Sequence, residues 1–218
     1  MSKKCPSCIL VNFASAEKCA RCGIALTREP VSGTKPRSAK AAILKRISVC
    51  IVVCICAVLG FYLSLILSAG RLKYDQKKQV ERAVAILDEK GFSDEVFLLS
   101  YVTAFRAEDN WLNASVAKEN AYAATNYPFE IMTVYADFFT YPADDTERAA
   151  ILLHEAKHLQ GKDEKEAYEF IWKNRAKLGW TKDKYGDSPV WLNVRKQTRE
   201  YVPSLFVCDV NEFGDCTE

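Results

Sequence analysis

A run of 24 residues without a charged side chain, from Ile47 to Gly70, constrains this 218-residue chain more than any other feature. A helix of about 20 apolar residues spans the hydrocarbon core of a bilayer. A helix in a soluble core would keep a polar face, which this run lacks. A cleaved signal peptide fits poorly, because 46 residues precede the run and Leu67 stands where a small residue would precede a cut after Ala69. The sequence therefore predicts an uncleaved, single-pass transmembrane helix over residues 47–70.

The charge distribution changes at this span and predicts its orientation. Residues 1–46 hold ten Lys or Arg and two acidic residues, a net charge of +8, whereas residues 71–218 carry −6. Basic residues close to the two ends are equal in number, so the prediction depends on the whole N-terminal segment, whose positive excess favours the cytoplasm. We therefore expect a cytoplasmic N-terminus and an extracytoplasmic domain over residues 71–218.

The N-terminal segment contains two Cys-x-x-Cys pairs, which are Cys5 with Cys8 and Cys19 with Cys22. Each pair can present two thiolates to one tetrahedral zinc ion. Thiolate ligands need a reducing compartment, as expected on the cytoplasmic side, and two disulfides are the alternative. Because so short a segment folds only with its metal, we predict a zinc ribbon with one structural zinc over residues 1–27. Residues 28–46, rich in Pro, Ser, Gly, Lys and Ala, are expected to form a flexible basic linker.

The cysteine motif resembles the small zinc ribbons that precede membrane helices in bacterial proteins, through its Cys-Pro-x-Cys and Cys-x-x-Cys-Gly knuckles, Asn12, Ala16 and Leu26. The spacing of Cys8, Asn12 and Cys19 is also similar to that of the RanBP2-type finger. Lys3 stands where that finger carries a tryptophan, which argues against binding of RNA or ubiquitin. We therefore expect no nucleic-acid partner and consider a cytoplasmic protein as the partner of the ribbon.

Both histidines of the chain belong to one motif, His154-Glu155-Ala-Lys-His158. In a helix, residues i and i+4 lie on one face a single turn apart, so both imidazoles can reach the same metal ion. The intervening Glu155 is then placed to take a proton from a water molecule. The pattern indicates a catalytic zinc site with His154 and His158 as ligands and Glu155 as general base.

Two capped helices are predicted around this motif, one from Asp144 to Gln160 and one from Asp163 to Gly179. A catalytic zinc has three protein ligands, and the chain offers no third histidine. We expect Glu164 to be the third, because it follows His158 by six residues across a glycine that permits a sharp turn. Glu166 and Glu169 remain alternatives, although Glu166 is better explained as the partner of the second helix cap.

This combination, HExxH followed by Glu164-x-x-Ala167, resembles the gluzincin zinc metallopeptidases over roughly residues 120–180. The resemblance implies a peptide or protein substrate, His154, His158 and Glu164 as ligands, and Glu155 as the base. It also implies a tyrosine or arginine that stabilises the oxyanion, for which the candidates are Tyr168, Tyr185, Arg195, Arg199 and Tyr201. The short gap before Glu164 is similar to that of metzincins, but those enzymes place a histidine there and a methionine turn downstream, and this chain has only Met1 and Met132.

The remaining patterns predict an α+β fold, with a small, mostly helical metallopeptidase-like domain and a short sheet. A helix is expected from Asp75 to Lys90 and a helical tendency from Trp111 to Ala124, whereas Val96 to Phe105 fits either helix or strand. Alternation from Glu130 to Phe139 predicts a strand, which could bind an extended peptide if it lies at the sheet edge. Cys208 and Cys216 are expected to close a terminal loop as a disulfide.

Two functional hypotheses follow from these patterns. The first is a membrane-anchored zinc metallopeptidase with one catalytic and one structural Zn²⁺. The second is a non-catalytic membrane adaptor or sensor, in which the ribbon recruits a cytoplasmic partner and the HExxH site is structural or vestigial. A Glu155→Gln variant separates them, because an enzyme would lose turnover and keep its metal.

Overall fold

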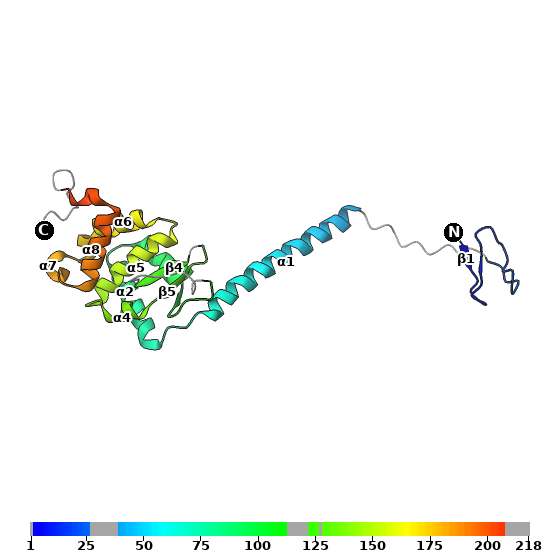
Figure 1. The fold of residues 1–218 in the computed structure, drawn as a ribbon, viewed down its shortest axis with the longest axis horizontal. Coiled ribbons are helices and arrows are strands. Elements are labelled where there is room, and N and C mark those ends of the chain that lie inside the picture. Colours follow the sequence, from blue (N-terminus) through cyan, green and yellow to red (C-terminus); the bar gives the residue numbers. More distant parts are fainter. Residues whose placement is uncertain (1, 27–38, 113–121, 127, 208–218) are drawn as a thin grey trace. The chain divides into compact units, whose positions relative to one another are not determined.

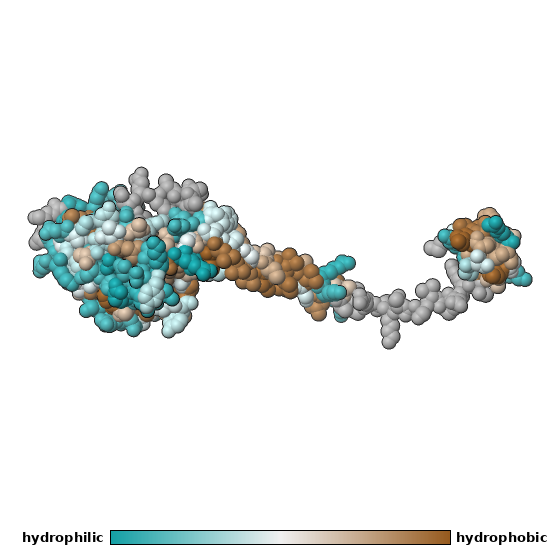
Figure 2. All heavy atoms as spheres, turned by 90° about the horizontal axis from the view of Figure 1, so that it is seen from below, coloured by the Kyte–Doolittle hydropathy of each residue, from teal (hydrophilic) through white to brown (hydrophobic). Residues whose placement is uncertain are grey.

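The computed structural model describes residues 2–26, 39–112, 122–126 and 128–207 and divides the chain into two compact units, Met1–Ile55 and Cys56–Glu218. The expected disulfide between Cys208 and Cys216 lies outside the described residues. Helix α1 (Ala39–Ser68) begins ahead of the predicted span, within the segment expected to be a flexible linker. Its part from Ala42 to Ser68 is long and apolar enough to cross a membrane by length and composition. Figure 2 shows apolar side chains along most of its surface.

The N-terminal unit is organised by its cysteines. Strands β1 (Ser2–Lys4) and β2 (Val11–Phe13) form an antiparallel pair, and an isolated bridge joins Lys18 to Ala25. The buried core of this unit consists of Cys5, Cys19 and Leu26. So small a core supports the view that a bound metal is needed to stabilise the fold.

The C-terminal unit contains a three-stranded sheet and a set of helices gathered around α5 (Figure 1). The sheet has the order β3 (Ala104–Arg106), β5 (Ile131–Val134), β4 (Ala123–Asn126), with β3 parallel and β4 antiparallel to β5. The helices and short helical turns are α2 (Tyr74–Glu89), α3 (Ser93–Phe97), the π-helical turn η1 (Leu98–Val102), α4 (Ala136–Thr140), α5 (Asp145–Leu159), α6 (Glu164–Leu178), α7 (Lys182–Tyr185), α8 (Pro189–Tyr201) and the 3-10 turn η2 (Pro203–Phe206).

The strand predicted from Glu130 to Phe139 is confirmed only over part of its length. The strand β5 covers only Ile131–Val134, and α4 follows from Ala136. All four residues of β5 are buried, because the strand is central in the sheet and both of its faces are covered. The edge strand beside α5 is instead β4, which includes the last residues of the segment expected to have a helical tendency.

Helix α5 forms the centre of this unit and contacts α2, α6 and β4. Its N-terminus is capped by Asp144, whose side chain accepts hydrogen bonds from the backbone N–H groups of Thr146 and Glu147. The Glu147 side chain is fully buried and accepts hydrogen bonds from the Ala143 N–H, the Trp180 indole and Ser188. Glu147 thus joins the start of α5 to a buried tryptophan cluster of Trp172, Trp180 and Trp191.

The last turns of α1 pack against other parts of the C-terminal unit. Leu65 is fully buried, and the ring of Phe61 lies edge-on to Trp111 at 5.6 Å. The Trp111 indole donates a hydrogen bond to the Ser64 hydroxyl. The end of the apolar helix is therefore held by specific contacts as well as by the chain connection.

Candidate metal centres

The HExxH motif lies in the last turns of α5, where the helix end fixes the side chains on one face. The helix ends at Leu159, and Gly161 adopts a positive φ of 74° that reverses the chain towards α6. The Gly161 N–H donates to the His158 carbonyl at 2.9 Å. A residue with a Cβ would be strained at this φ, so glycine allows the short connection between the two helices.

Helix α6 begins with the predicted capping box, which positions Glu164 at its first turn. The Asp163 carboxylate accepts a hydrogen bond from the Glu166 N–H at 2.8 Å, and the Glu166 side chain accepts one from the Asp163 N–H. Glu166 also pairs with Lys162, and Glu169 pairs with Lys173. Of the three glutamates considered from sequence, the structure therefore brings only Glu164 to the histidines.

The three side chains converge on one point. The Nε2 atoms of His154 and His158 lie 3.1 Å apart, and the Glu164 carboxylate oxygens lie 3.3 Å from the first and 3.5 Å from the second. Zinc bonds to nitrogen and oxygen of about 2.0–2.1 Å give a tetrahedral edge of about 3.3 Å. The two contacts of Glu164 are made by different carboxylate oxygens, and each of the three residues offers one ligand atom that could bind a shared metal ion.

The environment of the two imidazoles differs. The His158 Nδ1 lies 2.9 Å from the Lys162 carbonyl oxygen, which fixes Nδ1 as the protonated nitrogen of the neutral ring and leaves Nε2 free for a metal. The His154 Nδ1 is buried and has no hydrogen-bond partner among the described residues. His158 is therefore the better oriented of the two ligands.

The contacts among these side chains shift the pKa values of His158 and Glu164. Burial disfavours the charged form of His158, but the hydrogen bond to Glu164 and the charge of Glu155 outweigh it and raise the pKa of His158 to about 9. Hydrogen bonds from His154 and His158 lower the pKa of Glu164 well below its usual range. A proton on His158 thus occupies the position that a metal ion would take.

Glu155 is separate from this group and is held by the edge strand. Its side chain is almost completely buried, and its Oε2 accepts a hydrogen bond of 2.7 Å from the Thr125 hydroxyl of β4. Sequence analysis missed Thr125, since a strand of four residues next to a proline-containing turn is too short to give an alternating pattern.

Among the expected oxyanion candidates, Tyr168 and Tyr201 lie at the site. The Tyr168 ring is 4.3 Å from the His154 ring and stacks on Tyr201 at 5.4 Å, and burial raises the pKa of Tyr168. Tyr185 lies elsewhere, with its hydroxyl bonded to Asp144, and the Arg195 guanidinium lies over the Phe206 ring. The expected Arg199 is exposed on α8 and lines neither cavity beside the site.

Two cavities adjoin Glu155 and Glu164. The strand-side cavity, about 460 Å³, runs along β4 and is lined by Ala123, Ala124, Thr125, Asn126, Gly161 and Lys162. The helix-side cavity, about 240 Å³, lies beside His154 and is lined by α8 and by Tyr122 and Tyr168. A larger cavity of about 950 Å³ lies among α2, η1 and β3 and contains none of the predicted site residues.

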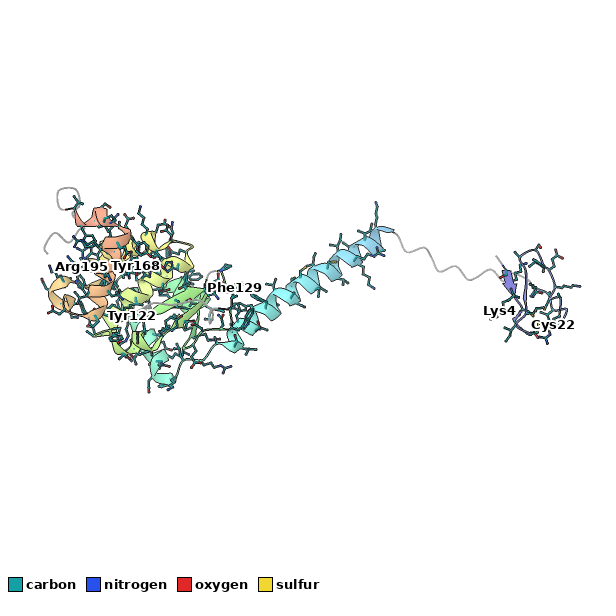
Figure 3. The ribbon with its side chains drawn as sticks, viewed as in Figure 1. Lys4, Cys22, Tyr122, Phe129, Tyr168 and Arg195 are labelled. Carbon is teal, nitrogen blue, oxygen red and sulfur yellow. The ribbon has the colours of Figure 1, made fainter. Side chains whose placement is uncertain are left out.

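The ribbon cysteines form a second possible metal centre (Cys22 is labelled in Figure 3). The sulfur atoms of Cys5 and Cys22 lie 3.5 Å apart and those of Cys8 and Cys19 lie 3.4 Å apart, with no disulfide among them. The Asn12 amide lies 3.7 Å from the Cys19 sulfur, and its oxygen accepts a hydrogen bond from the Ala20 N–H. Backbone N–H groups of Cys22 and Arg21 lower the pKa of Cys19 to about 6, which favours the thiolate that zinc binds.

Comparisons with protein-family models, with curated proteins and with solved structures found no match for this chain. The geometry of the two centres is therefore the basis for the functional argument.

Proposed function

We propose that the C-terminal unit is a zinc-dependent peptidase, anchored to a membrane by α1. One observation carries this proposal: the donor atoms of His154, His158 and Glu164 lie within 4.8 Å of one another, while Glu155 is held outside the group by a strand. A purely structural zinc site would use a fourth protein ligand, whereas a catalytic site keeps one position open. In the described residues this group has three members.

The residues present fit the chemistry of peptide hydrolysis. A bound zinc ion would lower the pKa of a water molecule and polarise the substrate carbonyl. Glu155 takes the proton from water, which adds to the carbonyl carbon. The C–N bond then breaks, and Glu155 delivers the proton to the leaving amine. Thr125 holds the Glu155 carboxylate in position for both transfers.

The edge strand β4 supports an extended peptide as the substrate. In the described part of the chain β4 pairs only with β5, so its outer edge can accept another strand. The strand-side cavity follows the whole length of β4 to Glu155. The Asn126 Nδ2 is buried without a hydrogen-bond partner in the described residues and could donate to a substrate carbonyl.

A second function is favoured for the ribbon by its surface. Ile9, Val11 and Phe13 are 65%, 60% and 85% exposed, although the unit has only a small core. Val11 and Phe13 alternate with buried Asn12 and so share one face of β2, and exposed apolar side chains on one face are typical of protein-binding surfaces. We propose that the ribbon holds a structural zinc and binds a cytoplasmic protein, with α1 crossing the membrane from the cytoplasm; attachment of a fluorescent maleimide to cysteines placed at either end of α1 would test the orientation.

Zinc content and turnover of the purified full chain test the peptidase. We expect the unsubstituted chain to bind two zinc ions and His158→Ala to bind one. Glu155→Gln should bind two zinc ions but should not hydrolyse a casein or peptide-library substrate. Glu166→Gln is the matched control, because this carboxylate caps α6 without facing the histidines, and it should keep both ions and activity. Undiminished hydrolysis by Glu155→Gln would rule the mechanism out, and two zinc ions in His158→Ala would rule out the site.

A further inference from the structure

The helix-side cavity has a composition that suggests what it binds. Helix α8 contributes Asn193, Val194, Gln197 and Tyr201, of which residues 193, 197 and 201 recur every four positions and so share one face of the helix. Its basic residues Arg195, Lys196 and Arg199 do not line the cavity. Apart from the metal group and Glu155, the cavity wall is therefore uncharged.

Uncharged polar groups of this wall can both donate and accept hydrogen bonds. The hydroxyl of Tyr122, the residue before β4, forms a hydrogen bond with the Asn193 side chain of α8. A carboxamide has two N–H donors and one acceptor oxygen, so Asn193 keeps capacity for a ligand and Gln197 adds more. Ile151, Val194 and the Tyr168 ring supply apolar surface beside them.

The helix-side cavity is small. Its volume of about 240 Å³ is below the range of about 300–1,000 Å³ that is typical of small-molecule pockets. It opens beside Glu155 and His154, where the scissile bond of a peptide would lie if the proposed function is correct. Figure 3 labels Tyr122 and Tyr168, which line the cavity from the residue before β4 and from α6.

We propose that this cavity is a specificity subsite for a neutral side chain with an apolar body and a hydrogen-bonding end, such as glutamine or tyrosine, next to the scissile bond. This inference rests on the proposed peptidase function. A bound zinc ion would offset the charges of Glu155 and Glu164, and α8 adds no charge to the wall. A charged side chain placed there would therefore lose its hydration without gaining a net opposite charge, which is costly in a partly buried cavity. Glutamine would instead pair its carboxamide with Asn193 or Gln197.

The test compares the zinc-loaded full chain with two variants of α8. Gln197→Glu puts a carboxylate in the cavity wall, and Leu192→Glu makes the same change in charge at an exposed position that does not line the cavity. A mixture of peptides randomised around a cleavable bond is digested, and the products are sequenced by mass spectrometry. Binding of fixed-sequence Gln, Glu and Lys peptides to Glu155→Gln is measured in parallel, so that preference is read without turnover.

We expect the unsubstituted chain to favour Gln or Tyr over Glu and Lys by about tenfold at one position flanking the cleaved bond. Gln197→Glu should move that preference to Lys, and Leu192→Glu should leave it unchanged. Equal tolerance of charged residues at both flanking positions, or the same shift in both variants, would overturn the subsite. Absence of cleavage by the unsubstituted chain would overturn the peptidase, and if the Gln peptide then also bound no better than the Glu and Lys peptides, the subsite would fail independently.

Discussion

The hydroxyl of Thr125 on the edge strand donates a 2.7 Å hydrogen bond to the carboxylate of Glu155 on α5. This bond joins the strand expected to align a substrate to the residue expected to move the proton. The two residues are 30 positions apart in the chain, so the pairing arises only when β4 packs beside α5.

Replacement of Thr125 by valine keeps the shape of the side chain and removes this donor. We expect peptide hydrolysis to fall about tenfold or more, since a positioned general base contributes about 10²–10⁴-fold, while zinc content stays at two per chain. Steady-state kinetics and metal analysis measure the two effects. Thr140→Val, which removes a hydroxyl that donates to the Ala136 carbonyl of the same helix, serves as the control; equal rates in both variants would contradict the role of Thr125.

Zinc affinity of the group formed by His154, His158 and Glu164 should rise with pH up to about pH 9. The pKa of His158 is raised to about 9 in the metal-free fold, so below that pH a proton must leave before the metal binds. The apparent affinity should increase by up to about tenfold per pH unit. Competition titration with a chromophoric chelator measures it, and an affinity that is constant between pH 7 and 9 would count against this assignment.

The raised pKa of His158 also predicts that the stability of the metal-free protein depends on pH. Because the folded-state pKa of His158 lies above its unfolded value of 6.5, this group stabilises the fold fully below about pH 6.5, and the stabilisation is lost as pH rises through about 9. Thermal unfolding of the metal-free chain should therefore show a Tm that declines over this window. Glu164→Gln removes the main stabilising partner of the charged ring and should flatten the decline.

A buried ion pair joins the HExxH motif of α5 to α3. Lys157, inside HExxH, pairs with Glu95 of α3, and both side chains are less than 10% exposed. The Lys157 ammonium also lies over the Phe170 ring. Loss of one partner leaves a buried charge, so Lys157→Met should lower the free energy of unfolding by about 3–5 kcal/mol.

The double variant Lys157→Met with Glu95→Leu removes both charges and should recover a large part of that stability. Urea denaturation of the three variants and the unsubstituted chain gives the coupling. If the double variant were as unstable as the sum of the single variants, the pair would carry no specific interaction.

The ribbon should depend on Asn12 for its metal affinity. The Asn12 side chain contacts the Cys19 sulfur and fixes the loop through the Ala20 N–H. Residues that orient ligands typically change metal affinity by about 10–100-fold, so Asn12→Ala should weaken zinc binding at the cysteines by about that factor. Zinc release to a thiol reagent measures this effect, and the exposed Ser15→Ala is the control that should behave like the unsubstituted chain.

Local patterns in the sequence determined the features that depend on neighbours along the chain. The caps at Asp144 and Asp163, the turn at Gly161, the apolar span and the cysteine knuckles follow from spacings of a few residues. The prediction that Glu164 lies beside the histidines also depended on local spacing. Glu164 follows His158 by only six residues, and Gly161 permits the sharp turn between them.

Tertiary packing alone decided the rest. Which strand lies at the edge of the sheet depends on pairing between β3, β4 and β5. Because β5 is buried on both faces, the alternation of residue types from Glu130 to Phe139 did not show where the strand ends. The role of Glu147 depends on Trp180 and Ser188, more than 30 residues away. Contacts between segments distant in sequence, such as those of Thr125 with α5 and of Tyr122 with α8, leave no periodic signal, because each depends on the final arrangement of whole elements.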